Sequence, residues 1–366
     1  MDSDLSSDLS LAAYDYRLPP ECIAQTPAVP RDSSKLLVVQ AQTKSDRIFR
    51  HLPEILRSGD LLVLNNTKVI PARLQGHKIN QDGSLGAKAE VLLLEQQAPD
   101  QWLALVKPGR KLPPGRQIQF TPLNPEEQCL ITAEILDRDP GTGGRLLRFT
   151  VSSGEALLTV IDRFGEMPLP PYIDERSSSP DQYQTVFAQH EGSAAAPTAG
   201  LHFTPELLER LAAAGIDRTF ITLHVGVGTF RPVELEVITE HQMHGEWIEV
   251  NADTVAKIHQ TQAQGGRVFA VGTTAARALE GAAQASDGEL APYCGKTAIF
   301  IYPGYQWRVI DGLITNFHLP KSSLMMMVSA LIGRERLLSL YKSAIESGYR
   351  FFSFGDAMVI LPEART

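Results

Sequence analysis

The sequence predicts an α/β protein in which a barrel-like α/β main domain carries a small inserted all-β barrel domain. The chain has 366 residues, 43% hydrophobic and 21% charged, which is typical of a globular protein with two domains. Short apolar or alternating runs divided by turn residues fill residues 67–151, whereas apolar strands and helices alternate on both sides of that stretch. We therefore predict a main domain of residues 1–66 and 152–366 and an inserted barrel of residues 67–151.

The first 13 residues are acidic and serine-rich, so they predict a solvated tail and not a signal peptide. The most apolar segment, residues 324–332, is far shorter than the roughly 20 residues that span a bilayer. Cys22, Cys129 and Cys294 are widely spaced, which argues against a disulfide framework or a thiolate zinc site. These features together predict a cytoplasmic protein.

Two strands, at residues 35–39 and 60–65, are predicted before the insert. Inside the insert, the strand patterns are AEVLLLEQ, QWLALV, QIQF, CLITAEIL and RLLRFTV, separated by turn signals such as Asp82-Gly83 and Pro114-Gly115. Several short strands at this spacing favour a small barrel or sandwich.

After the insert, Thr204 is the expected N-cap of a helix over residues 206–214 that ends at Gly215, and Asn251 is the expected cap of a helix reaching Gln264. A strand over 267–271 runs into a helix over 272–283. The remaining predicted strands cover residues 218–225, 297–302, 308–315, 349–354 and 357–361, and the remaining helices cover residues 322–332 and 334–347.

The net charge of −8 argues against indiscriminate nucleic-acid binding, but the charge is unevenly placed. Residues 67–151 carry 11 Lys plus Arg against 9 Asp plus Glu, and their turn KPGRKLPPG holds three cations. This turn is either a basic contact surface or a solvated loop.

The stretch from His190 to Pro232 combines three histidines with glycines at positions 192, 200, 226 and 228. Glycine permits backbone angles and close ligand approach that a Cβ forbids, and imidazoles donate, accept or bind metal. The cluster therefore predicts a ligand site, although turns and local packing would explain any one of these residues.

Two junctions between a strand and a helix are further candidate ligand sites. At the first junction, Gly272-Thr273-Thr274 brings backbone amides, hydroxyls and a helix N-terminus to one place, where an anion or a ribose could bind. The alternative is that these residues only cap the helix. The segment lacks the GxGxxG motif of a dinucleotide-binding Rossmann unit. Asn316 and His318 are candidates at the second junction, where Ser322 is expected to cap the next helix. We expect Met325, Met326 and Met327 to fill the core.

Several segments, read in order from about Tyr14 to Ile360, are similar to one known family. They include DYRLPPECIAQTPAVPRDSSKLL, LVLNNTKVIPARL, AAAPTAGLHFT, LHVGVGTFRPV, GTTAARALE, LITNFHLPKSSLMMMVSALIG and YRFFSFGDAM. They resemble the S-adenosylmethionine:tRNA ribosyltransferase-isomerases of queuosine biosynthesis. This sequence departs from the family pattern at four positions. Asn66 stands where the family has the Asp of its NDT motif, and Lys35 stands where it has the Arg of its SR motif. Ala275 and Ala278 stand where the family motif GTTS-R-TLE has Ser and Thr.

The resemblance implies a fold and a reaction. Such enzymes have an α/β domain with an inserted β-barrel. They move the ribosyl part of S-adenosylmethionine onto the aminomethyl group of 7-aminomethyl-7-deazaguanine in a tRNA anticodon loop, form epoxyqueuosine, and release adenine and methionine. We further predict a monomer that consumes S-adenosylmethionine as a substrate and needs no other cofactor and no metal.

This chemistry needs proton transfer. The sulfonium acidifies the C5′ protons, so a positioned base of modest strength can remove one, and the departure of adenine needs a proton donor near the purine. The predicted catalytic residues within the matching motifs are His202, His224, Glu246 and His318, with His202 and His224 preferred. Which residue is base and which is acid stays open.

Other residues of these motifs are predicted to bind the substrates: Arg17, Arg31, Asp32, Asn65, Thr67, Arg73, Thr198, Gly200, Phe203, Gly226, Gly228, Thr229, Phe230, Thr273, Thr274, Arg277, Tyr302, Asn316, Lys321 and Asp356. Among them Phe203, Phe230 and Tyr302 are aromatic candidates for contact with the cationic sulfonium, although packing accounts equally well for each. Lys107, Arg110 and Lys111 are predicted to hold tRNA phosphates.

Two alternatives remain at the level of sequence. A metal-dependent hydrolase on an α/β barrel would use His202, His224, His244 and His318 as ligands around an activated water. A non-catalytic RNA-binding module would use the glycine-histidine cluster for folding only.

Overall fold

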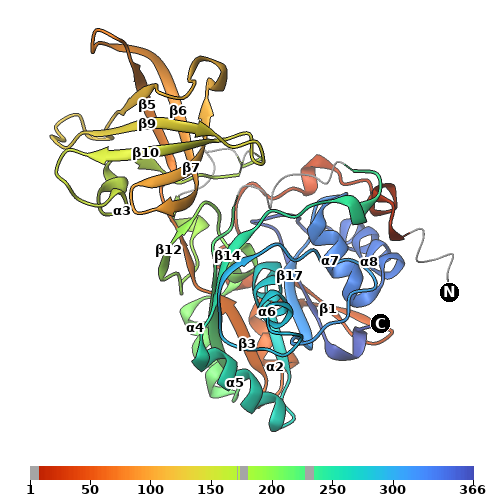
Figure 1. Ribbon diagram of the computed structural model, residues 1–366. Helices are drawn as coiled ribbons and strands as arrows, with labels where there is room; N and C mark the ends of the chain where they lie inside the picture. Colours follow the sequence, from red (N-terminus) through yellow and green to blue (C-terminus); the bar gives the residue numbers. More distant parts are fainter. Residues whose placement is uncertain (1–7, 171, 174–179, 227–234) are drawn as a thin grey trace.

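The computed structural model describes residues 8–170, 172–173, 180–226 and 235–366. Figure 1 shows a main part, in which helices cover a large sheet, and a separate β-barrel that projects from one end of it. The predicted α/β fold with an inserted β-barrel is confirmed.

The main part is built on a nine-stranded mixed sheet with the order β16-β14-β13-β3-β15-β17-β18-β1-β2. The four central strands, β13, β3, β15 and β17, are parallel to one another, and β18 is parallel to β1. The strands are β1 (Lys35–Val39), β2 (Lys44–Ile48), β3 (Leu61–Asn65), β13 (Asp217–Leu223), β14 (Glu246–Val250), β15 (Val268–Val271), β16 (Tyr293–Thr297), β17 (Gly312–Asn316) and β18 (Ala357–Ile360).

Helices cover both faces of this sheet because successive strand side chains point to opposite sides. On β1, Leu36 and Val38 join a core with α2 (Leu52–Ile55) and α4 (Pro205–Ala213). Leu37 and Val39 join a second, larger core on the other face, to which the remaining long helices contribute. These are α5 (Ala252–Ala263), α6 (Thr273–Ala285), α7 (Ser323–Ile332) and α8 (Arg334–Glu346).

The predicted helix caps are confirmed. The side chains of Thr204, Asn251 and Ser322 accept hydrogen bonds from backbone amides in the first turns of α4, α5 and α7. Met325, Met326 and Met327 are at most 2% exposed, as expected for core residues. Helix boundaries are set by local hydrogen bonding, which is why the sequence locates them well.

Two predicted strands are wrong. Residues 298–302 leave the sheet after β16, although Ile299 and Ile301 are buried. Residues 349–354 form only an isolated bridge between Ile23 and Phe351. An apolar run predicts burial, but whether its backbone pairs with a strand depends on the neighbours that the fold supplies.

Six antiparallel strands close the barrel in the order β5-β6-β7-β10-β9-β8, with β8 pairing back to β5. The strands are β5 (Arg73–Ile79), β6 (Leu85–Ala98), β7 (Gln101–Lys107), β8 (Gln117–Phe120), β9 (Ile131–Arg138) and β10 (Arg145–Val151). The barrel core also includes residues of α3 (Leu157–Val160) and Phe164, and β11 (Gly165–Glu166) pairs with β5. The barrel's packing thus continues past Val151, while the domain division itself stays a prediction.

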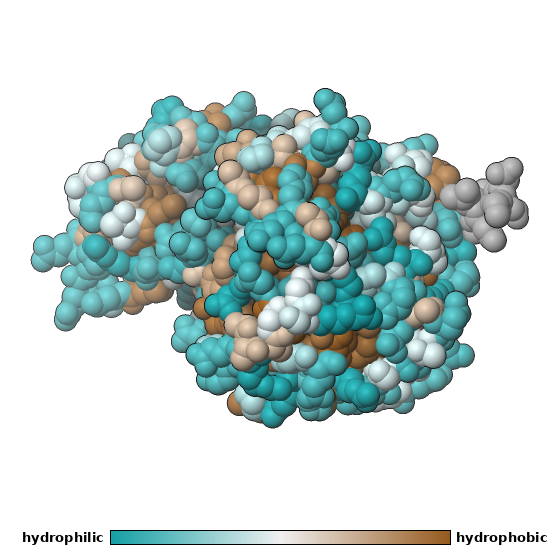
Figure 2. Space-filling model, turned by 90° about the horizontal axis from the view of Figure 1, so that it is seen from below, coloured by the Kyte–Doolittle hydropathy of each residue, from teal (hydrophilic) through white to brown (hydrophobic). Residues whose placement is uncertain are grey.

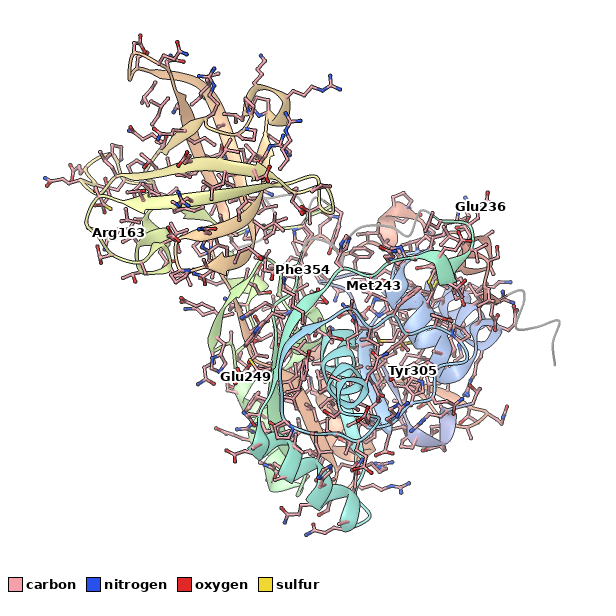
Figure 3. The ribbon with its side chains drawn as sticks, viewed as in Figure 1. Arg163, Glu236, Met243, Glu249, Tyr305 and Phe354 are labelled. Atoms are coloured by element: carbon pink, nitrogen blue, oxygen red, sulfur yellow. The ribbon has the colours of Figure 1, made fainter. Side chains whose placement is uncertain are left out.

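A pair of short strands and a small hydrophobic core lie between the barrel and the main part. β4 (Thr67–Val69) pairs with β12 (His190–Ser193) in a small parallel sheet. A satellite core that includes Tyr183, Leu201 and Phe354 packs beside it. Figure 3 shows Phe354 where the two parts meet and Arg163 on the barrel.

Hydrophilic residues dominate the face shown in Figure 2, where the hydrophobic areas are separate from one another. Within the described ranges, none of the helices combines enough length with enough hydropathy to cross a membrane.

Candidate functional site

A cavity of about 300 Å³ lies where β15 and β17 end. Because these strands are parallel neighbours, their carboxyl ends meet at one edge of the sheet, the usual place for ligands in open α/β sheets. Predicted site residues from three segments line this first cavity: Thr198, Thr273, Thr274, Asn316 and His318.

The N-terminus of α6 opens into the first cavity. Gly272 occupies its N-cap position with φ of +88°, which favours glycine, and contributes no side-chain cap. The buried hydroxyl of Thr274 has no hydrogen-bond partner in the described structure. Free amides at a helix N-terminus and an unused hydroxyl form a site suited to an anion.

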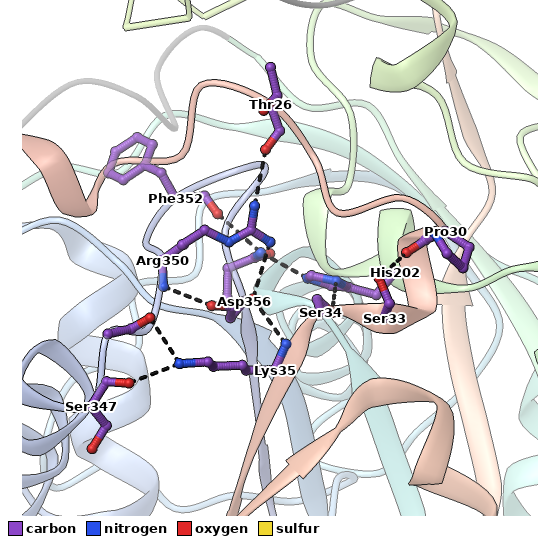
Figure 4. A network of polar contacts seen from close by, with 12 residues as sticks. Thr26, Pro30, Ser33, Ser34, Lys35, His202, Ser347, Arg350, Phe352 and Asp356 are labelled. Carbon is purple, nitrogen blue, oxygen red and sulfur yellow. Dashed lines mark hydrogen bonds and ion pairs between the residues drawn. The ribbon is translucent and has the colours of Figure 1, made fainter.

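Asn316 is held in the cavity wall by a chain of hydrogen bonds that includes His202 (Figure 4). Its amide nitrogen donates to Nε2 of His202 and to the carbonyl of Phe352, both at 3.2 Å, and its oxygen accepts from Thr198 at 3.0 Å. Nδ1 of His202 lies 2.9 Å from the hydroxyl of Ser34. With Asn316 donating to Nε2, the proton of the neutral imidazole lies on Nδ1.

His202 therefore lies behind the first cavity, and both of its ring nitrogens are engaged. It is 2% exposed. Burial, reinforced by the nearby guanidinium groups of Arg31 and Arg350, holds the pKa of His202 well below its usual value. This geometry suits a residue that orients Asn316.

His318 lines the cavity itself. Its Nε2 lies 2.8 Å from the hydroxyl of Thr315, while its backbone nitrogen donates to the hydroxyl of Tyr341 at 3.0 Å. Burial lowers the pKa of His318 to about 3 because it disfavours the charged form, so the imidazole is neutral.

A second pocket of about 220 Å³ lies between β6 of the barrel and β14 of the main sheet. His224 is in its wall, stacked on Trp247 with ring centroids 5.0 Å apart and with Nδ1 2.8 Å from the hydroxyl of Thr67. A Cβ on Gly192 would lie 2.9 Å from Nε2 of His224, so this glycine makes room for the imidazole. Burial lowers the pKa of His224 to about 4, with a smaller contribution from His190.

Glu246 also lines the second pocket and forms a buried ion pair with Arg277 of α6. The other carboxylate oxygen of Glu246 accepts from the amide of Gly226 at 3.2 Å. Arg277 is 3% exposed, and its Nε and second terminal nitrogen have no partner in the described structure. Arg277 lines neither the first cavity nor the second pocket, so its observed role is to hold Glu246 in the pocket wall.

The two pockets share a wall. Val225 lines the first cavity, whereas its neighbours His224 and Gly226 line the second pocket. Sequence reasoning placed His224 and Gly226 at a site but did not separate the two pockets.

Several predicted site residues serve the framework. Asn65 uses both ends of its amide on the backbone of Leu223 and Thr67, so it positions Thr67. Asp356 is 1% exposed and accepts from the backbone of Lys35 and from Arg350 (Figure 4). Both side chains are used within the protein, and a role for either residue in substrate binding stays a prediction.

Phe203 and Gly200 are likewise used in packing, and their binding roles stay predictions. The ring of Phe203 is 1% exposed and packs edge to face on Phe49. A Cβ on Gly200 would meet the ring of Phe187 at 2.8 Å, so close packing accounts for this glycine. Neither residue lines the first cavity or the second pocket.

The remaining predicted binding residues lie elsewhere. Nε of Arg31 donates to the carbonyl of Leu201, Tyr302 packs on Phe300, and Arg73 lies in β5. Asp32 pairs with Arg50 at 3.6 Å and Lys321 with Asp15 at 2.7 Å, as expected of surface ion pairs. Arg17 is exposed, as are Lys107, Arg110 and Lys111. Gly228, Thr229 and Phe230 lie outside the described residues.

Sequence reasoning missed Tyr172, Phe352 and Ser353, which line the first cavity, and Trp247 and Gln96, which line the second pocket. Phe352 stands in the motif YRFFSFGDAM and Trp247 follows Glu246, so adjacency to other candidates was the available signal.

The hydrolase alternative is not supported. No group of three potential His, Cys, Asp or Glu ligands occurs among the residues that the structure describes. His202 and His318 lie at the first cavity, while His224 lies in the second pocket, and His244 lines neither.

Comparisons with known proteins identify the family of this chain. The family model for queuosine biosynthesis proteins matches residues 11–360. A relative from Trichormus variabilis, named S-adenosylmethionine:tRNA ribosyltransferase-isomerase, is 58% identical over 99% of this chain and 94% of its own. A relative of the same name from Acaryochloris marina is 59% identical over 98% of this chain and 95% of its own.

A solved structure gives the same result. The crystal structure of S-adenosylmethionine tRNA ribosyltransferase from Thermotoga maritima is 37% identical, with a TM-score of 0.53 over 95% of this chain and 100% of that one. The chain therefore belongs to the queuosine biosynthesis protein family, the S-adenosylmethionine:tRNA ribosyltransferase-isomerases.

Proposed function

We propose that this enzyme transfers the ribosyl moiety of S-adenosylmethionine to the aminomethyl group of 7-aminomethyl-7-deazaguanine in a tRNA anticodon loop. The products would be epoxyqueuosine in the tRNA, adenine and methionine. The observation that supports this most is the pair of pockets on either side of the 224–226 segment, because the reaction joins two large substrates. We further propose a cytoplasmic monomer with no cofactor beyond the consumed S-adenosylmethionine.

S-Adenosylmethionine is assigned to the first cavity. Its carboxylate is its only anionic group, and the uncapped N-terminus of α6 with the free hydroxyl of Thr274 suits that group. A volume of about 300 Å³ is at the lower end of the range for small-molecule sites. This orientation directs the sulfonium and C5′ toward the rest of the cavity wall.

The tRNA nucleotide is assigned to the second pocket. A deazaguanine that leaves the anticodon stack can be read by stacking and by hydrogen bonds along its edge. The stacked rings of His224 and Trp247 offer an aromatic surface. The carboxylates of Glu95, Glu191 and Glu246 offer acceptors for the donor groups of the nucleotide, and each of them also pairs with a cation of the protein, Lys296, Lys68 or Arg277.

His318 is the proposed base for the C5′ proton. His318 and Tyr172 are the ionisable side chains in the described lining of the first cavity. Burial raises the pKa of Tyr172 well above its usual value, so its hydroxyl stays protonated, whereas the imidazole of His318 is neutral. The proton that it accepts could then reach the departing adenine, so a single imidazole would serve both steps. His202 acts through Asn316, and His224 remains a candidate for proton transfer at the second pocket.

Incubation of the enzyme with S-adenosylmethionine and tRNA carrying the aminomethyl-deazaguanine tests the function. We expect free adenine by chromatography and one sugar-derived addition to the RNA by mass spectrometry. S-Adenosylhomocysteine, which lacks the sulfonium, should give neither product. Tight tRNA binding without adenine release would instead support an RNA-binding module, and the proposal would fail.

A further inference from the structure

We infer that Phe352 and Tyr172 form an aromatic wall that holds the sulfonium of S-adenosylmethionine in the first cavity. This inference rests on the proposed function. Both residues line the cavity, and their rings meet edge to face with centroids 4.2 Å apart and planes at 80°. They come from segments about 180 positions apart in the sequence, so the fold builds this aromatic pair beside Asn316 and Thr198.

The chemistry of the ligand favours an aromatic partner. A sulfonium is a cation without a hydrogen to donate, so it is stabilised by anionic groups or by the negative faces of aromatic rings. Neither Asp nor Glu is present in the described lining of the cavity. The third aromatic ring there, Phe317, is 0% exposed and packs among Tyr341, Tyr349 and Phe351.

The backbone at Phe352 is held in an unusual conformation. Its φ of +76° is unfavourable for a residue with a large side chain and persists only where surrounding contacts enforce it. Its amide donates to the carbonyl of Phe317 at 3.2 Å, and its own carbonyl accepts from Asn316 at 3.2 Å and from Gly355 at 3.0 Å. The hydrogen-bonded chain that begins at His202 thus also fixes the position of the aromatic ring (Figure 4).

Tyr172 is anchored as firmly. Its hydroxyl forms a short hydrogen bond with the hydroxyl of Ser353, the residue that follows Phe352. Burial keeps the pKa of Tyr172 well above its usual value, so its ring stays uncharged. Two neutral rings with fixed orientations supply a preorganised surface for a cation.

The test compares a cationic ligand with a neutral one. Calorimetric affinities of the wild type and Phe352→Leu are measured for S-adenosylmethionine and for the thioether S-adenosylhomocysteine. Leucine keeps an apolar side chain but removes the π face. We expect about ten-fold weaker binding of S-adenosylmethionine and less than about a three-fold change for the thioether.

Controls separate this effect from a general loss of structure. Phe352→Tyr should restore the preference for the cation, and Phe300→Leu, at a half-buried phenylalanine outside both pockets, should change neither affinity. Equal weakening of both ligands by Phe352→Leu, or no weakening of either, would overturn the inference. If the wild type binds S-adenosylmethionine through this wall but leaves the tRNA unmodified, the proposed function is wrong and the inference about the aromatic wall still holds.

Discussion

At the scale of single residues, two buried histidines, His202 and His318, and the half-buried His224 share one electrostatic property in different settings. Burial keeps His202, His224 and His318 neutral near pH 7. A neutral imidazole accepts hydrogen bonds, which suits the orientation of Asn316 by His202, and its free electron pair is what the proposed base role of His318 requires. Their placement, and not their residue type, separates these roles.

The same burial predicts sensitivity to acid. A pKa lowered on folding means that the unfolded chain binds more protons, so the stabilisation is present above pH 6.5 and is lost as the pH falls from 6.5 toward about 3 for His318. One pKa unit corresponds to about 1.4 kcal/mol, so the full shift of the His318 pKa corresponds to a loss on the order of 5 kcal/mol. Urea unfolding at pH 7, 6, 5 and 4 should show a flatter pH dependence for His318→Gln than for the wild type. The exposed His259, changed to Gln, should leave the dependence as it is, and parallel curves for all three proteins would contradict the prediction.

Kinetics should distinguish His318 from His202. His318→Gln should lower kcat by about 10²-fold or more with unchanged tRNA affinity, because it removes the proposed base. His202→Gln should chiefly raise KM for S-adenosylmethionine, because Asn316 and Phe352 lose their support. Steady-state and single-turnover rates of adenine release measure both effects. A near-normal kcat in His318→Gln would remove this residue from the mechanism.

His224 is tested separately. His224→Ala should retain the fold and tRNA affinity and lose turnover by about 10²-fold if the residue transfers a proton. Adenine release at saturating tRNA is the measurement. A raised tRNA KM with unchanged kcat would instead assign it to base stacking with Trp247.

At the scale of secondary-structure elements, the junction between β15 and α6 decides where the first cavity lies. The strand delivers Gly272 to the sheet edge, and its positive φ turns the chain into a helix whose amides face the cavity. An element boundary therefore acts as a binding group.

Gly272→Ala should reduce both stability and ligand binding. An L-residue at φ of +88° costs about 1 to 2 kcal/mol, and the change perturbs the amides proposed for the carboxylate. Gly59→Ala is the matched control, because φ is +90° there and the added Cβ would meet open space. Thermal unfolding and calorimetry with S-adenosylmethionine should show lower stability for both variants and weaker binding for Gly272→Ala alone. Equal affinities in the two variants would exclude this part of the site.

At the scale of the whole molecule, the barrel and the main sheet together enclose the second pocket. Leu94, Glu95 and Gln96 come from the barrel, whereas Glu246 and Trp247 come from the sheet. Lys296 of β16 pairs with Glu95 across this junction at 2.5 Å. RNA bound along the barrel would thus lie next to the proposed site of chemistry.

Replacement of Lys107, Arg110 and Lys111 by Ala should weaken tRNA binding and flatten its salt dependence. Each lost phosphate contact lowers the slope of log K against log salt by roughly 0.7 to 0.9. Fluorescence anisotropy at several salt concentrations gives the slope. The control is a triple alanine variant of three exposed cations on the main part, which loses the same charge: Arg47, Arg57 and Lys342. Identical slopes for both triple variants would reject the barrel turn as a phosphate contact.

The sequence by itself determined most helix caps, the methionine-filled core, the alternation of helices and strands, and the inserted barrel. These features depend on local hydrogen bonding and on the periodicity of apolar residues, which neighbouring positions define. It also carried the family resemblance through motifs that cover nearly the whole chain.

Only the tertiary structure decided which of the candidate residues meet. Asn316 reaches His202 from 114 positions away, and Tyr172 meets Ser353 from 181 positions away. His202, His318 and His224 became a buried support, a cavity wall and a stacking surface because different strands and loops surround them. A cavity depends on the order of strands in the sheet and on the packing around it, and no local pattern of residues encodes either.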